Sequence, residues 1–334
     1  MLRHFSIIGA VLIFAALGSS TIALSQASAW GRGYLPNTPV VTQNGETLRF
    51  YDDVIKGKIV VISFIYTSCR DICPVVTARL AQVQDKLGDA VGRDIFFVSI
   101  SIDPANDTPE KLKDYADAFG AGKGWTFLTG KTEDMDLIRH KLGERSRKLS
   151  EHGNMVMLYN DMTSEWSRDS AFSDLNVLTE NIRTMNPAWS SSREEATKQA
   201  AAKAVGETSV APDLPGQSLF IKTCSACHTI GKGDKIGPDL SGIATRRSRE
   251  WIVSYLVNPG KMRTQGDPTA LELAAKYPAI RMPTLSLSED DASDLMGYVE
   301  AMTYGATAAS KDPQAQHRRP GAQGHAAGDH HHHH

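Results

Sequence analysis

Cysteine is scarce in this chain of 334 residues, and its few copies are not placed as structural disulfides would require. The four cysteines form two close pairs, Cys69 with Cys73 and Cys224 with Cys227. No cysteine is left over to join distant segments, which excludes a framework held by disulfides. Each pair is spaced for chemistry at a single site.

An excess of charge of either sign is also missing. Lysine and arginine number 36 and aspartate and glutamate 38, which gives a formal net charge of −2. Domains that bind nucleic acid usually carry a strong positive charge, so nucleic acid is excluded as a partner. A hydrophobic content of 41% is typical of a soluble globular protein, and the length allows two domains.

Long apolar runs are absent except near the N-terminus. Residues 7–24 are apolar, follow a short basic start and precede Ala27, Ser28 and Ala29. Small residues at these positions predict a signal peptide, residues 1–29, cleaved after Ala29. The alternative is an uncleaved membrane anchor, since the run has about the length of a minimal span. In both cases we expect a periplasmic protein, anchored to the cytoplasmic membrane in the second case.

Strands and helices alternate in the first domain, predicted over residues 30–186. Residues 58–66 and 94–102 are apolar, β-branched runs that predict strands buried on both faces. Helical spacing follows at 74–88 and 132–142, and a helix after Thr108 begins with Pro109. A further strand is expected at 154–160. This order predicts a thioredoxin-like α/β domain.

Residues 187–213 are rich in Ala, Ser, Lys and Glu and poor in large apolar residues, which predicts a linker. The next domain, residues 214–305, is predicted to be all-α, with one helix ending before Pro259. Its last helix is expected to begin after Ser288 as N-cap.

That last helix is expected to bury Leu295, Val299 and Met302 on one face. Residues 306–334 are of low complexity and are predicted to be disordered. Their terminal histidines are either a purification tag or a native metal-binding tail.

The second cysteine pair belongs to the motif Cys-Ser-Ala-Cys-His, which ends at His228. C-x-x-C-H is the signature of covalent c-type haem, in which two thiols add to the vinyl groups and the histidine binds iron. The alternative is a redox or zinc C-x-x-C pair beside an incidental histidine. Export favours haem, because bacterial attachment of haem c takes place outside the cytoplasmic membrane.

Met282, followed by Pro283 in an extended segment, is the predicted sixth ligand of the iron. The competing methionines are Met262, Met296 and Met302.

With "GPDLSGI" after the haem motif and "MP" before the last helix, the second domain resembles a small monohaem cytochrome c over its whole length. The resemblance implies ligation by His228 and Met282, which raises the haem potential. No residue suited to activating a substrate is evident, so an electron carrier is favoured over a catalyst. Arg246, Arg247 and Arg249 form either a docking patch or a solvated helix edge.

The first cysteine pair lies where a strand gives way to a helix. Cys69 follows the strand and Cys73 precedes Pro74 at the first helical turn, where the helix dipole stabilises a thiolate. This arrangement suits disulfide exchange, and it equally suits Cu(I), which prefers thiolates. Two sulfur atoms alone leave copper undercoordinated, so a third ligand would decide between these functions.

Two histidines are candidates for that third ligand. His140 falls within a predicted helix, where it would face solvent or the edge of the core. His152 lies in the loop just before a buried strand, from which a side chain can reach a neighbouring loop. A single loop histidine is more often structural or exposed, but the C-x-x-x-C-P motif of this domain favours His152.

The stretches "GKIVVISFIYTSCRDICP", "SIDPANDTPEKLKDYADAFG", "WTFLTG" and "EHGNMVMLYN" together resemble the Sco/SenC copper chaperones. The resemblance implies a thioredoxin-like fold and a copper site made by Cys69, Cys73 and His152. The sequence departs from the family at Arg70, where proline is common, and at Glu151 and Gly153, where Asp and Ser are more usual. These departures concern the tuning of the site rather than its ligands.

The resemblance also implies a client. It is the subunit carrying the binuclear copper centre of a respiratory oxidase, which receives copper or has its cysteines reduced before loading. A related reductase, such as nitrous oxide reductase, is the alternative client.

The leading hypothesis is therefore a copper-binding metallochaperone and redox protein with its own electron-transfer haem c, working with periplasmic redox partners. A His/Met haem lies above thiol–disulfide couples in potential, so electrons are predicted to flow from the dithiol or from Cu(I) to the ferric haem. The alternatives are an enzyme, a thiol–disulfide oxidoreductase acting through Cys69 and Cys73, and a plain respiratory electron carrier.

Overall fold

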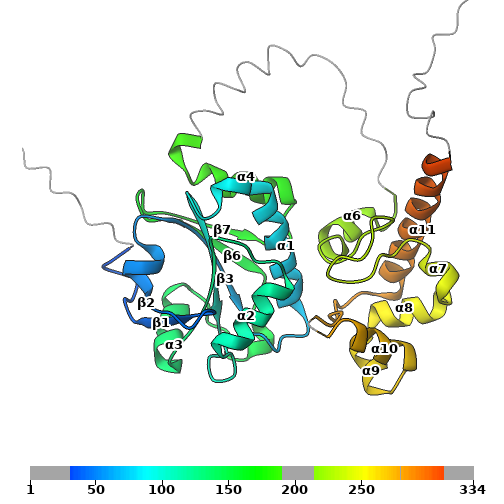
Figure 1. The fold of residues 1–334 in the computed structure, drawn as a ribbon, viewed down its shortest axis with the longest axis horizontal. Coiled ribbons are helices and arrows are strands. Elements are labelled where there is room, and N and C mark those ends of the chain that lie inside the picture. The colour runs from blue at the N-terminus through cyan, green and yellow to red at the C-terminus, as the bar shows by residue number, and fades with distance from the viewer. Residues whose placement is uncertain (1–30, 190–213, 279, 312–334) are drawn as a thin grey trace, which may run out of the picture.

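The computed structural model describes residues 31–189, 214–278 and 280–311, with side chains described as far as Tyr304. The described residues form two lobes, one from each predicted domain (Figure 1). The predicted signal peptide or anchor, residues 190–213 of the predicted linker and residues 312–334 of the predicted tail lie outside them. Among the described residues, no helix combines the length and apolar character needed to cross a bilayer.

The first lobe is built on a sheet of seven strands in the order β2-β1-β5-β4-β3-β6-β7. β3 and β4 pair in parallel, as do β4 and β5, while β1, β6 and β7 join antiparallel. The strands are β1 (Pro39–Thr42), β2 (Thr47–Arg49), β3 (Ile59–Ile65), β4 (Ile95–Ser101), β5 (Trp125–Thr129), β6 (Met155–Asn160) and β7 (Glu165–Ser170). This is the thioredoxin-like architecture predicted from the sequence.

Helices cover both faces of the central strands. Alternate β3 residues such as Val61 pack with α1 (Ile72–Leu87), α2 (Pro109–Ala118) and α4 (Leu175–Thr184). The intervening residues, such as Ile62, pack with α3 (Thr132–Lys141) and the π-helix η1 (Phe50–Ile55). All seven residues of β3 are buried, as the apolar run predicted.

The helix boundaries follow the predicted signals. The Thr108 side chain accepts a hydrogen bond from the backbone N–H of Lys111, with Pro109 at the first helical position of α2. α1 begins at Ile72, two residues ahead of the predicted start, and so includes Cys73 in its first turn.

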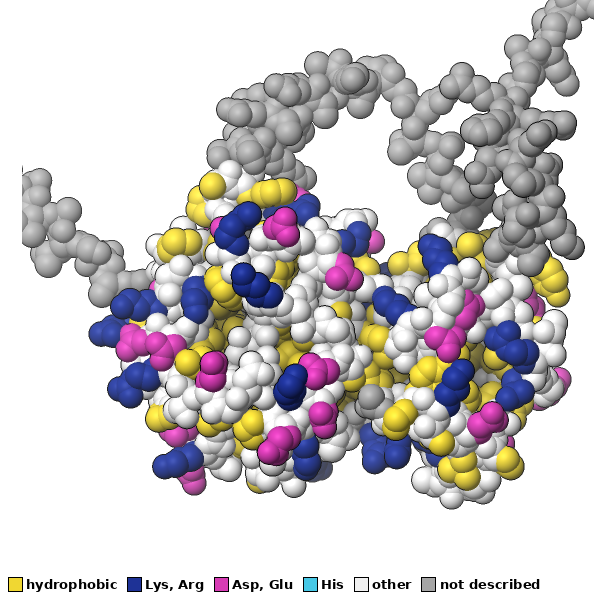
Figure 2. All heavy atoms as spheres, in the orientation of Figure 1, with side chains coloured by type: hydrophobic (Ala, Val, Ile, Leu, Met, Phe, Trp, Pro, Cys, Tyr) yellow, Lys and Arg dark blue, Asp and Glu magenta, His cyan; other side chains and the backbone are white. Residues whose placement is uncertain are grey.

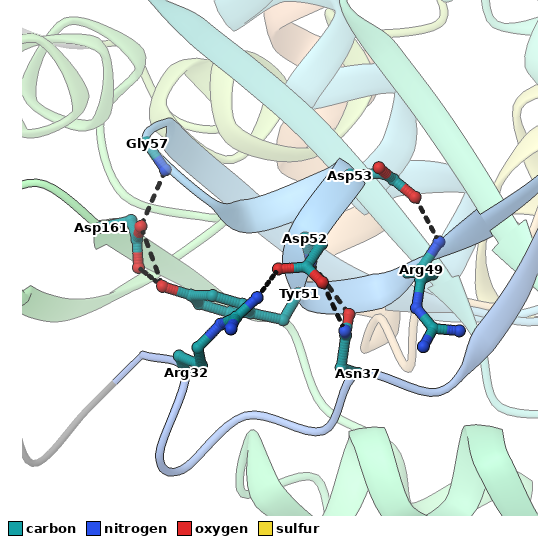
Figure 3. A network of polar contacts seen from close by, with 8 residues as sticks. All are labelled: Arg32, Asn37, Arg49, Tyr51, Asp52, Asp53, Gly57 and Asp161. Atoms are coloured by element: carbon teal, nitrogen blue, oxygen red, sulfur yellow. Dashed lines mark hydrogen bonds and ion pairs between the residues drawn. The ribbon is translucent and has the colours of Figure 1, made fainter.

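A polar network fixes the N-terminal segment against the first lobe (Figure 3). Arg32 and Asn37 both donate to the Asp52 carboxylate, at 2.5 and 2.6 Å. Asp161 accepts from the Tyr51 hydroxyl and from the backbone N–H of Gly57. The network lies where the chain enters β3, at the end opposite to Cys69, and its role is structural.

The second lobe is helical, as predicted. Its helices are α6 (Gln217–Leu219), the π-helix η4 (Phe220–Cys224), α7 (Ile243–Arg246), α8 (Arg249–Val257), α9 (Pro259–Thr264), α10 (Pro268–Lys276) and α11 (Glu289–Lys311). Ser248 caps α8 by accepting from the backbone N–H of Trp251, and the Ser288 hydroxyl accepts from the backbone N–H of Asp291 at the start of α11.

Two expectations for α11 need correction. Leu295 and Val299 are buried, but Met302 is 41% exposed and does not belong to the core. The helix also continues to Lys311, past residue 305, where the disordered tail was predicted to begin. Thr303, the next residue, is the one turned toward the rest of the lobe, since its hydroxyl accepts a hydrogen bond from the backbone N–H of Gly242 before α7, and this leaves Met302 on the outer side of α11.

Candidate copper and haem sites

The turn after β3 and the first turn of α1 bring the first cysteine pair together. The backbone N–H of Cys69 donates to the Tyr66 carbonyl at 3.0 Å, which closes the turn. The Cys69 side chain is hydrogen-bonded to Cys73, which is fully buried, and neither cysteine forms a disulfide.

His152 is brought against this pair from the loop before β6. Its Nε2 atom lies 3.0 Å from the Cys73 Sγ atom, and its ring is 7% exposed. Its Nδ1 atom is buried and has no hydrogen-bond partner among the residues that the structure describes. His140 instead lies exposed on α3, away from the pair.

The donor set of two thiols and one imidazole fits a soft copper ion. The unpartnered Nδ1 atom and the Nε2–Sγ contact leave the imidazole without any other polar partner in the described residues. Within that part of the chain, however, no group of three or more His, Cys, Asp or Glu side chains is arranged as a ready metal site. Cys69, Cys73 and His152 would be the residues that hold copper, with Cys73 and His152 already in contact.

The two thiols differ sharply in acidity. The hydrogen bond from Cys73, aided by the Tyr66 hydroxyl, lowers the pKa of Cys69 to about 6. Burial, together with the charge of the neighbouring Cys69, raises the pKa of Cys73 far above its usual range. Burial also lowers the pKa of His152, which keeps the imidazole neutral and able to bind a metal.

This difference predicts a pH profile for alkylation of the reduced, copper-free protein. The thiolate is the reactive form, so the rate at Cys69 should rise with pH through a midpoint near 6, as the thiol loses its proton. Mass spectrometry after timed exposure to iodoacetamide would locate the adduct. A midpoint near the ordinary value of about 8.5, or modification of Cys73 first, would contradict it.

A buried carboxylate supports the cysteine turn, and sequence reasoning gave it no role. Asp107 is 1% exposed and accepts hydrogen bonds from the backbone N–H and the hydroxyl of Thr67, at 3.1 and 2.6 Å. It also accepts from the Ser101 hydroxyl at the end of β4. Asp107 thereby ties the start of the cysteine turn to the neighbouring strand. The available signal was the segment "SIDPANDT" at the end of a buried strand.

The second lobe holds a cavity of about 550 Å³, a size common for ligand sites. Its walls carry all four predicted haem-binding residues: Cys224, Cys227, His228 and Met282. Its lining is mostly apolar in character, with Ile236, Trp251 and Ile252 among its side chains. The site predicted from the motif and the distant methionine is thus assembled in one pocket.

The proximal histidine is held in a defined tautomer. The His228 Nδ1 atom lies 2.9 Å from the Pro238 carbonyl oxygen, to which it donates, so Nε2 is left for a metal. A Cβ atom on Gly237 would lie 2.6 Å from the His228 Cε1 atom, which shows how closely the backbone supports the ring. These residues fit a haem held by Cys224, Cys227 and His228.

Met282 is the methionine that lines the cavity among those considered; Met262 and Met296 are absent from its walls within the described residues. The Arg263 guanidinium donates to the Met282 carbonyl at 3.4 Å and so helps to position this segment.

The three arginines Arg246, Arg247 and Arg249 do not form one common patch in the structure. Arg246 and Arg247 line the cavity, where their charge suits the carboxylates of a haem. Arg249 instead lies near Glu300, at 3.6 Å, and bonds Ser293 on α11.

The cavity cysteines differ chemically from the first pair. Burial raises the pKa of Cys224 to about 12 and that of Cys227 to about 11, so both are protonated thiols at neutral pH. Acidity therefore distinguishes the first cysteine pair from the pair spaced for haem attachment.

Comparison with known proteins divides the chain in the same way. The SCO1/SenC family model matches residues 39–164, and the cytochrome c family model matches residues 214–303. A SCO1 protein homolog of Bacillus subtilis is 37% identical over 93 residues, 28% of this chain and 48% of that protein. A putative copper-binding protein of Stutzerimonas stutzeri is 29% identical over 133 residues, 37% of this chain and 63% of that protein. The chain thus spans about half to two-thirds of the length of these relatives.

Solved structures align with the first lobe. A SCO1/SenC family lipoprotein of Bacillus anthracis is 26% identical, with a TM-score of 0.40, and the match covers 45% of this chain and 94% of that one. Yeast Sco1 with copper bound is 22% identical, with a TM-score of 0.37, covering 47% and 98%. On the two family models, the chain carries a thioredoxin-like SCO1/SenC domain followed by a cytochrome c domain.

Proposed function

We propose that this protein is an exported copper chaperone and redox protein that binds copper through Cys69, Cys73 and His152. Its client is the copper-centre subunit of a respiratory oxidase or a related reductase. The cytochrome domain exchanges electrons with the copper site or its dithiol. When bound, the haem supplies a one-electron couple.

The observation that carries this proposal is the 3.0 Å contact between the Cys73 Sγ and His152 Nε2 atoms. These atoms are the two kinds of donor that Cu(I) accepts, and they meet in a buried site beside a second thiol. The description of one relative as copper-binding supports copper, and the SCO1/SenC domain supports a role in assembly.

The test is an anaerobic Cu(I) titration of the haem-loaded protein, with His152→Ala compared against His140→Ala. We expect His152→Ala to weaken binding by at least about 100-fold, because loss of a mere outer-sphere partner already costs 10–100-fold. His140→Ala serves as the matched control, since this histidine is exposed on α3. Equal affinity in the two variants would overturn the assignment of His152.

One observation favours a second function, thiol–disulfide exchange with protein cysteines. The low pKa of Cys69 beside a resolving thiol, Cys73, is the arrangement used by such enzymes. In this case Cys69→Ser would abolish reduction of a disulfide substrate while His152→Ala would leave its rate unchanged. If His152→Ala instead lost both copper binding and the reduction of the disulfide substrate, the copper function alone would be favoured.

A further inference from the structure

The two lobes meet along a seam formed by α1 and the haem-attachment segment. Figure 1 shows α1 as the helix of the first lobe that faces the second, and Figure 2 shows hydrophobic side chains where the lobes meet. Ala226, inside the haem motif, is 1% exposed and belongs to the same buried cluster as Val76 and Leu80 of α1. The Gln82 side chain donates to the Ser225 carbonyl at 3.2 Å.

Arg79 is the polar centre of this seam. It is 1% exposed, and its guanidinium donates to the carbonyls of Ile221 and Lys222, at 3.3 and 2.6 Å. Other donors of the same group bind the carbonyls of Ala171 and Ser173 in its own lobe. Ile221 and Lys222 lie in η4, the helix that ends at Cys224, so one buried cation joins both lobes next to the haem-attachment site.

A second contact joins the two metal-binding segments themselves. The backbone N–H of Thr284 donates to the Arg70 carbonyl at 3.3 Å. Arg70 directly follows Cys69, and Thr284 lies two residues after Met282. A single hydrogen bond therefore connects the cysteine turn with the segment that carries the predicted axial methionine.

We propose that Arg79 is the docking residue that holds the cytochrome domain on α1, so that the haem segment and the cysteine turn act as one redox unit. The electron-transfer part rests on the proposed function. One electron leaves Cu(I) and one enters the ferric haem, with no other reactant, and docking holds the two segments together for this step.

Docking itself is tested without copper, by hydrogen–deuterium exchange on the full-length, haem-loaded protein. In Arg79→Met, two hydrogen bonds from a charged donor across the seam are lost, and we expect exchange at Thr284 and in residues 217–228 to rise about tenfold or more. Arg183→Met is the matched control. This substitution removes a hydrogen bond from an arginine of α4 to the carbonyl of Lys86, which lies at the C-terminal end of α1. It should leave hydrogen–deuterium exchange at Thr284 and in residues 217–228 unchanged.

Because Arg79 also binds carbonyls of its own lobe, a second variant approaches the seam from the cytochrome side. Ala226→Gln places a larger polar group against α1 while leaving the first lobe unaltered, and it should raise exchange at Thr284 to a similar degree. Protection of Thr284 retained in either variant, or lost equally in Arg183→Met, would overturn the docking role.

Stopped-flow reduction of the ferric haem by bound Cu(I) then tests the redox consequence. The rate constant should not depend on protein concentration in either protein, because both domains belong to one chain, but it should be about tenfold or more lower in Arg79→Met, in which the undocked domains meet only through the linker. Equal rate constants in the two proteins would overturn the single redox unit. Failure to bind copper at all would count against the proposed function and leave the exchange result standing.

Discussion

Replacement of Met282 by alanine is expected to lower the reduction potential of the haem by on the order of 200 mV. Axial ligands tune haem potentials across about 0.8 V, and a methionine thioether raises the potential by favouring the ferrous iron. Met282 lines the haem cavity, and its carbonyl is held by Arg263, so its side chain is placed for this role. A spectroelectrochemical titration of the purified full-length protein would measure the shift.

Met302→Ala is the matched control for this experiment. Met302 belongs to the same domain but is 41% exposed on α11, so its loss should leave the potential unchanged. An unchanged potential in Met282→Ala would contradict the predicted ligation and move the assignment to Met262 or Met296. A lowered potential would also weaken the haem as an acceptor of electrons from Cu(I), which a slower stopped-flow phase would reveal.

Gly216→Ala is expected to destabilise the cytochrome domain by about 2–5 kcal/mol. Gly216 has a φ of +78°, a left-handed conformation that costs other residues about 1–2 kcal/mol. A Cβ atom there would lie 2.3 Å from the Asp294 carbonyl oxygen, in the backbone of α11. The clash cannot be relieved by turning a side chain, so α6 and α11 must separate, and such overpacking costs about 1–3 kcal/mol more.

Gly233→Ala separates the two causes. Gly233 has a similar φ of +85°, but a Cβ atom added there would have no other atom within 4 Å among the described residues, so only the conformational cost applies. Denaturant unfolding followed by haem absorbance would report on this domain alone. Equal destabilisation in the two variants would contradict the predicted clash between position 216 and the backbone of α11.

The sequence predicted those features that depend on local pattern. Hydrophobic patterning placed β3, β4 and α1, Thr108 with Pro109 placed the start of α2, and the capping signals at Thr108 and Ser288 were confirmed. The haem-binding residues predicted from the C-x-x-C-H motif and "MP" meet in one cavity. Each of these signals lies within a short stretch of chain, where propensity and spacing act directly.

The features that escaped prediction depend on long-range packing. Every residue of α1 from Cys73 to Leu80 is buried, because the sheet covers one side and the second lobe another, yet Arg79 in this stretch looks like a surface residue. Met302 has the spacing of a core residue, but in this turn of α11 it is Thr303 that contacts the segment before α7, and Met302 stays exposed. Asp107 supports the cysteine turn through contacts that its own segment does not reveal.

The hydrogen bonds of Arg79 across the seam end on main-chain oxygens, and this has an evolutionary consequence. Side chains at positions 221 and 222 are free to vary without weakening the contact, since each carbonyl is present whatever the residue. Among descendants of this fusion, position 79 should remain arginine while its two acceptors drift in identity. A search for correlated substitutions would then miss this interface, because only the residue at position 79 is constrained and its two acceptors are not.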